Sequence, residues 1–241
     1  SNRARRVEDA AAVAIVVAGG TGERFGSVGG KQLALVRGLP VLSHTLRALD
    51  GARSVEAVVV VVHPERVAEY RDAAVSPLSL ATPVSVVAGG MTRQDSVRNG
   101  LAATAADARI IAVHDGARPL VTPELVDEAV SIVQAGADGV VVGHEAYDTL
   151  KVVTEDVVVE TPDRSRYWIA QTPQVFRADI LRSAYDEAAR TGRRGTDDAS
   201  LVEAIGGRIR MLQGPRTNIK VTVAEDLSVV EALLGLREDR R

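Results

Sequence analysis

The sequence of 241 residues contains no cysteine. Disulfide bridges, cysteine-ligated zinc and a thiol nucleophile are therefore excluded. The chain has four histidines, and no two of them have the H-x-x-x-H spacing of a metal-binding pair. Aromatic residues make up only 3% of the chain, which argues against a surface that stacks on nucleic-acid bases.

Strong net charge and long apolar runs are also missing. The net charge of −3 predicts no general attraction to nucleic acid or anionic lipid. No apolar run approaches the ~20 residues of a membrane span. Residues 3–17 resemble a signal peptide only loosely, because Glu8 and Asp9 interrupt them. We therefore expect a cytoplasmic protein with a flexible N-terminus over residues 1–12 and no nucleic-acid or membrane partner.

What the sequence does contain is a regular alternation of short apolar segments with helical segments. Its hydrophobic content of 46% is enough for one domain, expected over residues 13–241. Continuous apolar strands between helices predict an α/β, Rossmann-like fold, with a mostly parallel sheet covered by helices on both faces. The predicted strands are 13–17, 57–62, 83–87, 110–114, 139–142 and 208–212. The predicted helices are 40–49, 64–73, 92–103, 123–134, 178–190, 198–205 and 224–236.

The alternation stops after the fifth strand. Residues 145–176 contain no convincing helix, and two β-rich segments, 149–153 and 157–160, flank a Thr-Glu-Asp turn. This pattern predicts a projecting β-hairpin arm inserted into the domain.

The loop after the first strand has the composition of a phosphate site. Its small residues, 18–22, let backbone N–H groups approach an anion closely, and Arg24 and Lys31 follow to neutralise it. The loop is not a dinucleotide fingerprint, because Phe25 replaces the third glycine. It is not a Walker loop either, because Gln32 stands where Ser or Thr is required. An ordinary tight turn with solvated cations is the alternative.

Further polar residues follow other strands, at the edge where parallel sheets bind ligands. Asp115 follows the fourth strand and could hold Mg²⁺ beside a phosphate loop, or it could cap a turn or pair with Arg118. Its neighbour His114 is expected to be a hydrogen-bonded strand-end residue. Lys220 lies in an apolar, β-branched segment and must meet either solvent or an anion. Residues 196–198 indicate a helix N-terminus, with a metal role for the two aspartates as a lesser alternative.

In their order and spacing, these segments resemble the 2-C-methyl-D-erythritol 4-phosphate cytidylyltransferases of the non-mevalonate isoprenoid pathway. The resemblance extends from residue 13 to residue 234. The matching segments are A-G-G-x-G-x-R (18–24) with K-Q (31–32), G-G-x-x-R-x-D-S-V (89–97), V-H-D-G-A-R-P (113–119), D-T-L-K (148–151), Q-T-P-Q (171–174), T-D-D-A-S (196–200) and N-I-K-V-T (218–222).

The resemblance implies a nucleotidyltransferase-type fold and a reaction. CMP would pass from CTP to 2-C-methyl-D-erythritol 4-phosphate, with release of pyrophosphate and with Mg²⁺ as cofactor. The arm over residues 145–176 would form a homodimer and reach into the neighbouring subunit's site. A ribitol-5-phosphate cytidylyltransferase and a non-catalytic nucleotide-binding module on the same fold are the alternatives.

Site residues are also implied by the resemblance. The implied catalytic residues are Arg24, Lys31, Arg164 and Lys220. The implied nucleotide-binding residues are Ala18, Gly19, Gly20, Gly22, Gly90, Ser96, Asp115 and Gly116, with Gly90 and Ser96 in the cytosine pocket. The implied substrate-binding residues are Asp115, Arg118, Thr149, Arg164, Thr172, Thr196 and Lys220. Asp115 is the implied metal-side acid.

The chain departs from the family pattern at three positions. Gly19 and Gly116 each stand where the family commonly has Ala, and both changes keep a small residue beside the backbone. Thr217 stands where an Asp is common before Asn-Ile-Lys. The loss of that carboxylate weakens the case for a second metal ligand in this loop.

Overall fold

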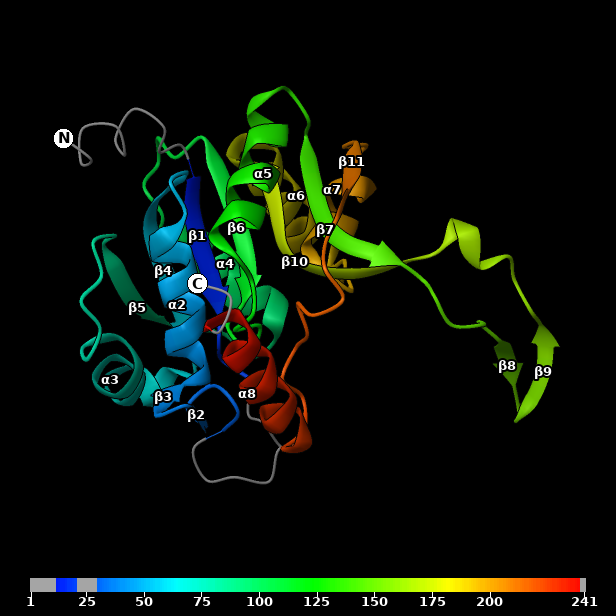
Figure 1. Cartoon of the computed structure of the whole chain (residues 1–241). Helices are drawn as coiled ribbons and strands as arrows, with labels where there is room; N and C mark the ends of the chain where they lie inside the picture. The colour runs from blue at the N-terminus through cyan, green and yellow to red at the C-terminus, as the bar shows by residue number, and fades with distance from the viewer. Residues whose placement is uncertain (1–11, 21–29, 239–241) are drawn as a thin grey trace.

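A computed structural model describes residues 12–20 and 30–238. Its centre is a seven-stranded sheet in the order β11-β7-β10-β6-β1-β4-β5 (Figure 1). The strands are β1 (Ala12–Val17), β4 (Val55–Val62), β5 (Val84–Ala88), β6 (Ile110–Asp115), β7 (Gly139–Glu145), β10 (Trp168–Arg177) and β11 (Ile209–Gln213). Only β10 runs antiparallel to its neighbours in this sheet. The predicted mostly parallel α/β fold is confirmed.

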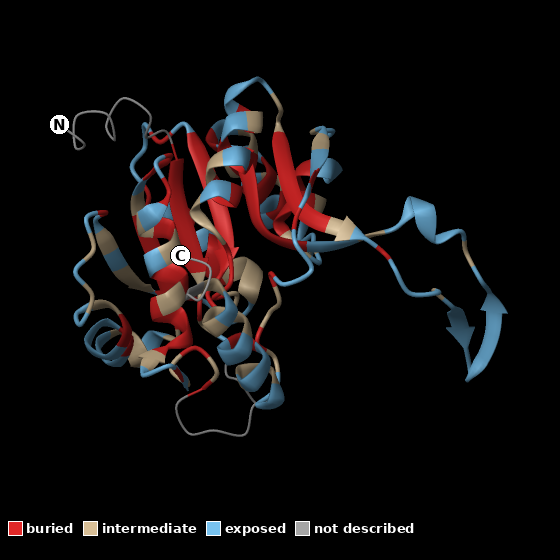
Figure 2. Ribbon diagram, viewed as in Figure 1, coloured by how far each residue is buried: buried red, intermediate tan, exposed pale blue. Residues whose placement is uncertain are grey.

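Alternating side chains of the central strands form two apolar layers. Ala14 and Val16 of β1 pack with one layer, which includes helices α2 (Val41–Gly51) and α5 (Pro123–Gln134). Ile15 packs with the other, which includes α4 (Arg93–Ala103), α6 (Ala178–Thr191) and α7 (Asp198–Ala204). Helices therefore cover both faces, and Figure 2 shows the sheet buried between them. A third cluster joins α8 (Glu225–Glu238) to a short hairpin of β2 (Leu35–Val36) and β3 (Leu39–Pro40).

Predicted helix starts match the structure best where the capping residue lies directly beside the start of the helix in the sequence. Helix α5 has the bounds predicted from Pro123, and the Thr122 side chain accepts the Leu125 N–H. Helix α4 begins with a capping box between Thr92 and Asp95. The helix predicted over 64–73 is less regular: a 3-10 turn (Pro64–Arg66), a short α3 (Val67–Tyr70) and a π-helical turn (Arg71–Val75) follow one another.

The predicted hairpin is present and projects away from the sheet (Figure 1). It consists of β8 (Val152–Thr154) and β9 (Val157–Glu160), and every residue of both strands is exposed. A 3-10 turn (Arg164–Arg166) lies between β9 and β10.

The boundaries of the predicted arm and N-terminus need correction. Strand β10 falls largely inside the predicted arm, 145–176, yet it pairs with β6 and β7 in the middle of the central sheet. The projecting part is therefore residues 146–167. Ala12, assigned to the flexible N-terminus, is fully buried and begins β1; residues 1–11 lie outside the described part of the chain. Within the described ranges, no helix is both long and apolar enough to cross a membrane.

Candidate active site

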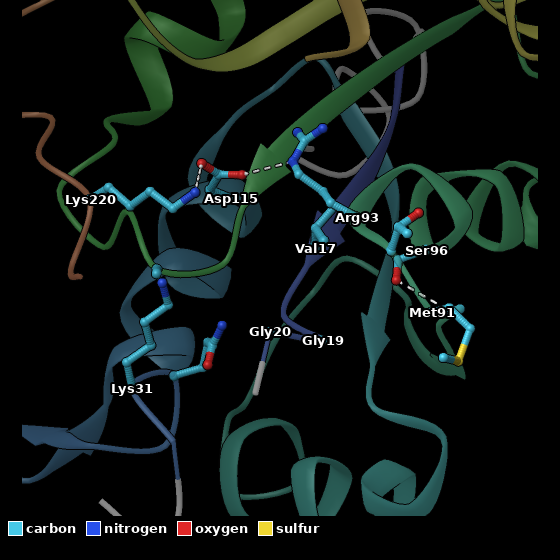
Figure 3. Close-up of a pocket in the computed structure, with 13 residues that line it drawn as sticks. Val17, Gly19, Gly20, Lys31, Met91, Arg93, Ser96, Asp115 and Lys220 are labelled. Atoms are coloured by element: carbon cyan, nitrogen blue, oxygen red, sulfur yellow. Dashed lines mark hydrogen bonds and ion pairs between the residues drawn. The ribbon is translucent and has the colours of Figure 1, made fainter. Parts of the chain in front are cut away.

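One cleft lies beyond the carboxyl ends of β1, β5 and β6, the edge at which the sequence predicts a ligand. Its volume is about 320 Å³, in the range of small-molecule sites. The residues that line and define the cleft are Val17, Gly19, Gly20, Lys31, Gln32, Gly90, Met91, Thr92, Arg93, Ser96, Asp115, Ala117 and Lys220. Figure 3 shows this cleft in close-up.

Small residues let two loops meet on one side of the cleft. A Cβ on Gly89 would lie 2.7 Å from Ser96 Oγ and 3.1 Å from the Val62 carbonyl oxygen. Gly90 N–H donates to Ser96 Oγ at 3.1 Å, so this side chain holds the turn that begins α4. A Cβ on Gly19 would meet its nearest neighbours only at 3.5 Å and beyond. Position 89 therefore requires glycine, whereas position 19 has room for a methyl group.

Asp115 gathers three cations on the other side, and these four residues form what we call the Asp115 cluster. Lys220 Nζ lies 2.9 Å from Oδ2, Arg118 Nε 3.5 Å from Oδ2, and Arg93 Nε 3.6 Å from Oδ1. Figure 3 shows Lys220 and Arg93 reaching the carboxylate from opposite sides. Burial alone would raise the pKa of Asp115, but these charges outweigh it and hold the pKa well below its ordinary value.

The backbone at Asp115 is fixed by its neighbours. Asp115 N–H donates to Thr172 Oγ1 of β10 at 3.0 Å, and that hydroxyl also bonds His114 Nδ1 at 3.0 Å. The His114 ring is completely buried, and its Nε2 lies 3.3 Å from the Arg118 carbonyl oxygen. Burial lowers the pKa of His114 to about 4, so the ring is neutral at pH 7. His114 is thus a hydrogen-bonded strand-end residue, as expected.

The segment that carries Lys220 is anchored by buried hydrogen bonds. Asn218 Nδ2 donates to the Thr172 carbonyl oxygen at 2.8 Å, and Arg118 Nη1 donates to the Asn218 carbonyl oxygen at 2.7 Å. Val221 N–H donates to the Ala117 carbonyl oxygen at 2.8 Å. Lys220 is therefore held over Asp115 by contacts on both sides of it in the chain.

Arg93 is a cleft residue that sequence reasoning does not assign. Its Nη2 donates to Asp198 Oδ2 at 2.8 Å, and the hydroxyl of Tyr185 donates to Asp198 Oδ1 at 2.5 Å. Asp198 is completely buried. In the sequence, Arg93 is marked only as the fifth residue of the G-G-x-x-R segment. A single arginine does not indicate that its partner is Asp198, which lies 105 residues later.

Comparisons with known proteins agree with this geometry. The family model described as 2-C-methyl-D-erythritol 4-phosphate cytidylyltransferase matches residues 12–236. The chain belongs to this family. A 2-C-methyl-D-erythritol 4-phosphate cytidylyltransferase from Rubrobacter xylanophilus is 44% identical over 95% of this chain and 97% of its own length. One from Syntrophotalea carbinolica is 41% identical over 93% and 97%. The crystal structure of 4-diphosphocytidyl-2C-methyl-D-erythritol synthase from Anaerococcus prevotii superimposes with a TM-score of 0.82, at 25% identity, covering 94% of this chain and 99% of the other.

The structure brings seven of the residues implied by the cytidylyltransferase resemblance to the lining of the cleft. Those that line it are Gly19, Gly20, Lys31, Gly90, Ser96, Asp115 and Lys220. Ala18 and Gly116 are buried next to each other behind it, since a Cβ on Gly116 would lie 3.2 Å from Ala18 Cβ. Arg118 and Thr172 contact Asp115 from outside the cleft.

Other implied residues lie apart from the cleft. Thr196 is exposed just before the Asp197 cap of α7 and does not line the cleft. Thr149 and Arg164 are exposed on the arm, where Arg164 Nη1 donates to the Tyr147 carbonyl oxygen. Gly22 and Arg24 lie outside the described residues.

The donor set of the cleft limits how this cytidylyltransferase could hold a metal ion. Among the described residues no three His, Asp or Glu side chains cluster as a metal site, and Asp115 is the carboxylate that lines the cleft. Mg²⁺ is commonly held by one or two carboxylates together with substrate phosphates and water. Asp115 therefore fits an ion that takes most of its other ligands from phosphate oxygens and water. Asp197 caps α7 and Asp198 pairs with Arg93, which gives both aspartates a role without a metal.

We predict opposite effects of alanine at Gly19, which lines the cleft, and at Gly89, the neighbour of the lining residue Gly90. Gly19→Ala should keep kcat/KM within about threefold and raise stability by ~0.5 kcal/mol, because the methyl group fits and the unfolded chain loses freedom. Gly89→Ala should lose ~1–3 kcal/mol, because its Cβ would overlap Ser96 and the Val62 carbonyl. Urea unfolding and steady-state kinetics would measure both, and an equally tolerated Gly89→Ala would contradict the packing argument.

We predict that His114 makes stability depend on pH below neutrality. Its folded pKa of about 4 lies below the value of about 6.5 in the unfolded chain. Between these values the unfolded state binds the proton and the folded state does not, so stability falls as pH falls. The loss should reach about 2 kcal/mol by pH 5. Urea unfolding of His114→Gln between pH 7 and 5 should give a flatter profile, and a profile parallel to that of the wild type would contradict the prediction.

Proposed function

We propose that this chain transfers the CMP group of CTP to 2-C-methyl-D-erythritol 4-phosphate, forming 4-diphosphocytidyl-2-C-methyl-D-erythritol. A phosphate oxygen of the sugar alcohol attacks the α-phosphorus of CTP, and the bond between that phosphorus and the bridging oxygen to the β-phosphate breaks. The electron pair leaves with pyrophosphate. The displacement is in line and forms no covalent enzyme intermediate.

The chemistry demands positive charge rather than a general base. The second pKa of a phosphate monoester is about 6, so the nucleophile is already ionised at neutral pH. The barrier comes from bringing this dianion up to a triphosphate, and fixed cations around the α-phosphorus and leaving group lower it. Lys31 and Lys220 are suited to that task, because both line the same cleft.

The observation that carries the proposal is that one cleft contains both a turn suited to a nucleotide base and lysines suited to phosphate groups. The turn held by Gly90 and Ser96 offers backbone and hydroxyl groups to a base, while Lys31 and Lys220 offer charge to phosphates. An arrangement of this kind fits a nucleoside triphosphate and a second phosphorylated substrate. Membership of a cytidylyltransferase family names the nucleotide and the sugar alcohol.

Magnesium belongs to the proposal as the ion bound to CTP. Asp115 would be its protein ligand and the triphosphate would supply further oxygens. When bound, the ion neutralises charge on the phosphates. Lys220 already contacts Oδ2 of Asp115 at 2.9 Å, and Arg93 Nε lies 3.6 Å from Oδ1.

A homodimer through the arm is the second part of the proposal. Valines at positions 152, 153, 157, 158 and 159 are between 42% and 63% exposed on the hairpin, which is unusual for apolar side chains without a partner. Thr149 and Arg164 lie on the same arm, and neither lines the cleft of its own chain. A second copy seated on the hairpin would cover the valines and place Arg164 beside its bound sugar phosphate.

Pyrophosphate release tests the reaction and its cations. The wild type should release pyrophosphate from CTP with 2-C-methyl-D-erythritol 4-phosphate, and much more slowly with ribitol 5-phosphate or with ATP, GTP or UTP. Lys31→Ala should lower kcat ~10²–10³-fold, because one preorganised charge contact is lost. Arg190→Ala is the control, since it removes a cation from an exposed pair with Glu187 on α6.

Two results would contradict the proposal. Faster turnover with ribitol 5-phosphate would assign the chain the sister activity. Wild-type turnover by Lys31→Ala would contradict the proposal that the charge of Lys31 stabilises the transition state.

Mixing two inactive variants tests whether Arg164 acts across the dimer. In a symmetric dimer with exchanged arms, Lys31→Ala and Arg164→Ala leave one intact site in each mixed dimer. An equal mixture of the two, allowed to exchange subunits, should regain about a quarter of wild-type activity at subsaturating sugar phosphate. The activity should be assayed before and after exchange.

The matched control mixes Lys31→Ala with Lys220→Ala. Both lysines line the cleft of one chain, so no mixed dimer contains an intact site and no activity should return. Recovery in the control, or none in the test mixture, would contradict an arm that acts in the neighbouring site.

A further inference from the structure

Arg93 joins parts of the chain that are far apart in sequence. It is the first residue of α4 and follows the turn that carries Gly90. Its guanidinium reaches Asp198 Oδ2 at 2.8 Å through Nη2 and Asp115 Oδ1 at 3.6 Å through Nε. The side chain therefore contacts a carboxylate on α7 and a carboxylate on β6 at the same time.

The next residue reinforces the same connection. Gln94 Nε2 donates to the Arg193 carbonyl oxygen at 3.0 Å, and Gln94 Oε1 accepts the Gly195 N–H at 3.0 Å. The first turn of α4 is thus bound to the segment that leads into α7. That segment contains Thr196, one of the residues implied for the sugar alcohol.

At the α7 end of this connection, the Asp198 carboxylate is buried and both of its oxygens accept hydrogen bonds. Asp198 is completely buried, and its second oxygen accepts the Tyr185 hydroxyl at 2.5 Å. The charge of Asp198 contributes to a raised pKa for Tyr185, beyond the effect of burial, which keeps the phenol a donor. A buried carboxylate with two strong partners has little freedom to move. Asp198 therefore fixes one end of the Arg93 guanidinium.

We propose that Arg93 is a positioning residue that sets the distance between the nucleotide cleft and the segment before α7 that carries Thr196, a residue implied for the sugar alcohol. It does so by holding the Asp115 carboxylate and the first turn of α7 on one rigid, planar group. This inference rests on the proposed function and deepens it. It assigns to Arg93 the alignment of the attacking phosphate, with no contact to the nucleotide required.

Arginine is needed for this role because two separate carboxylates must be held at once. The guanidinium presents five N–H donors in a fixed plane, so its two edges can serve different partners. A lysine keeps the charge beside buried Asp198 but concentrates it on one nitrogen at the end of a flexible stem. Arg93→Lys therefore removes the geometric connection and retains the charge.

The test compares binding with turnover in Arg93→Lys. We expect the Kd for CTP, titrated without the sugar alcohol, to stay within about threefold of the wild type. We expect kcat to fall by about 10- to 100-fold and the KM for the sugar-alcohol phosphate to rise, because a misplacement of ~1 Å can cost ~10² in rate. Arg98→Lys is the control, because it makes the same change on the exposed face of α4.

A second variant tests the contact between Arg93 and Asp198 from the Asp198 side. Tyr185→Phe leaves Arg93 in place but removes a hydrogen bond from Asp198, so kcat should fall about threefold. If Tyr185 acts through Arg93, the double variant should be no slower than Arg93→Lys alone. Tyr185→Phe also tests the inference if Arg93→Lys fails to fold.

Each outcome separates this inference from the function it rests on. No pyrophosphate release by the wild type would overturn the proposed function and this inference with it. An active wild type with equally active Arg93→Lys and Tyr185→Phe would overturn the inference alone. A loss of CTP affinity in proportion to kcat/KM would make Arg93 a nucleotide contact. Effects that multiply in the double variant would make the two residues independent, and either result would also overturn the inference.

Discussion

The arrangement of the cleft depends on one buried carboxylate. Without Asp115, the cations of Lys220, Arg93 and Arg118 would repel one another in a partly buried setting where water screens them poorly. With it, each cation lies within 3.6 Å of an opposite charge. The cations are therefore already in place before a ligand arrives. Preorganised charge of this kind needs little rearrangement during a reaction, which is the main source of its catalytic value.

Asp115 can serve as this centre because of the strand next to it. Strand β10 returns from the arm, runs antiparallel beside β6 and brings Thr172 to the Asp115 backbone. Asn218 bonds the carbonyl of that same threonine, which ties the Lys220 segment to β10. The projecting arm and the cleft are consequently connected through a single strand.

The sequence predicts what local signals determine and misses what distant contacts determine. Helix α5 is predicted correctly because Thr122 and Pro123 mark its start by themselves. Strand β10 is missed because Gln171-Thr172-Pro173-Gln174 is polar and contains a proline, features that argue against a central strand. The structure accommodates Pro173 at the register shift between Ala170 and Gln174, where the pairing with β7 is interrupted. Arg93 is missed for a related reason, since its ion-pair partner Asp198 lies 105 residues away.

The charges around the cleft also bear on why a second copy would be required. The Asp115 cluster and Lys31 supply four cationic side chains, and the carboxylates of Asp115 and Asp198 offset two of them. The remaining charge is less than that of a nucleoside triphosphate, so these side chains cannot also neutralise an incoming phosphate monoester. Further positive charge would come from Mg²⁺, from Arg24, which lies outside the described residues, or from the arm of a second copy. In the proposed dimer, Arg164, which is exposed on the arm, would provide such charge to the neighbouring cleft. In the proposed dimer the arm would add to the electrostatics of the neighbouring site, and the exposed valines of the hairpin would provide the attachment.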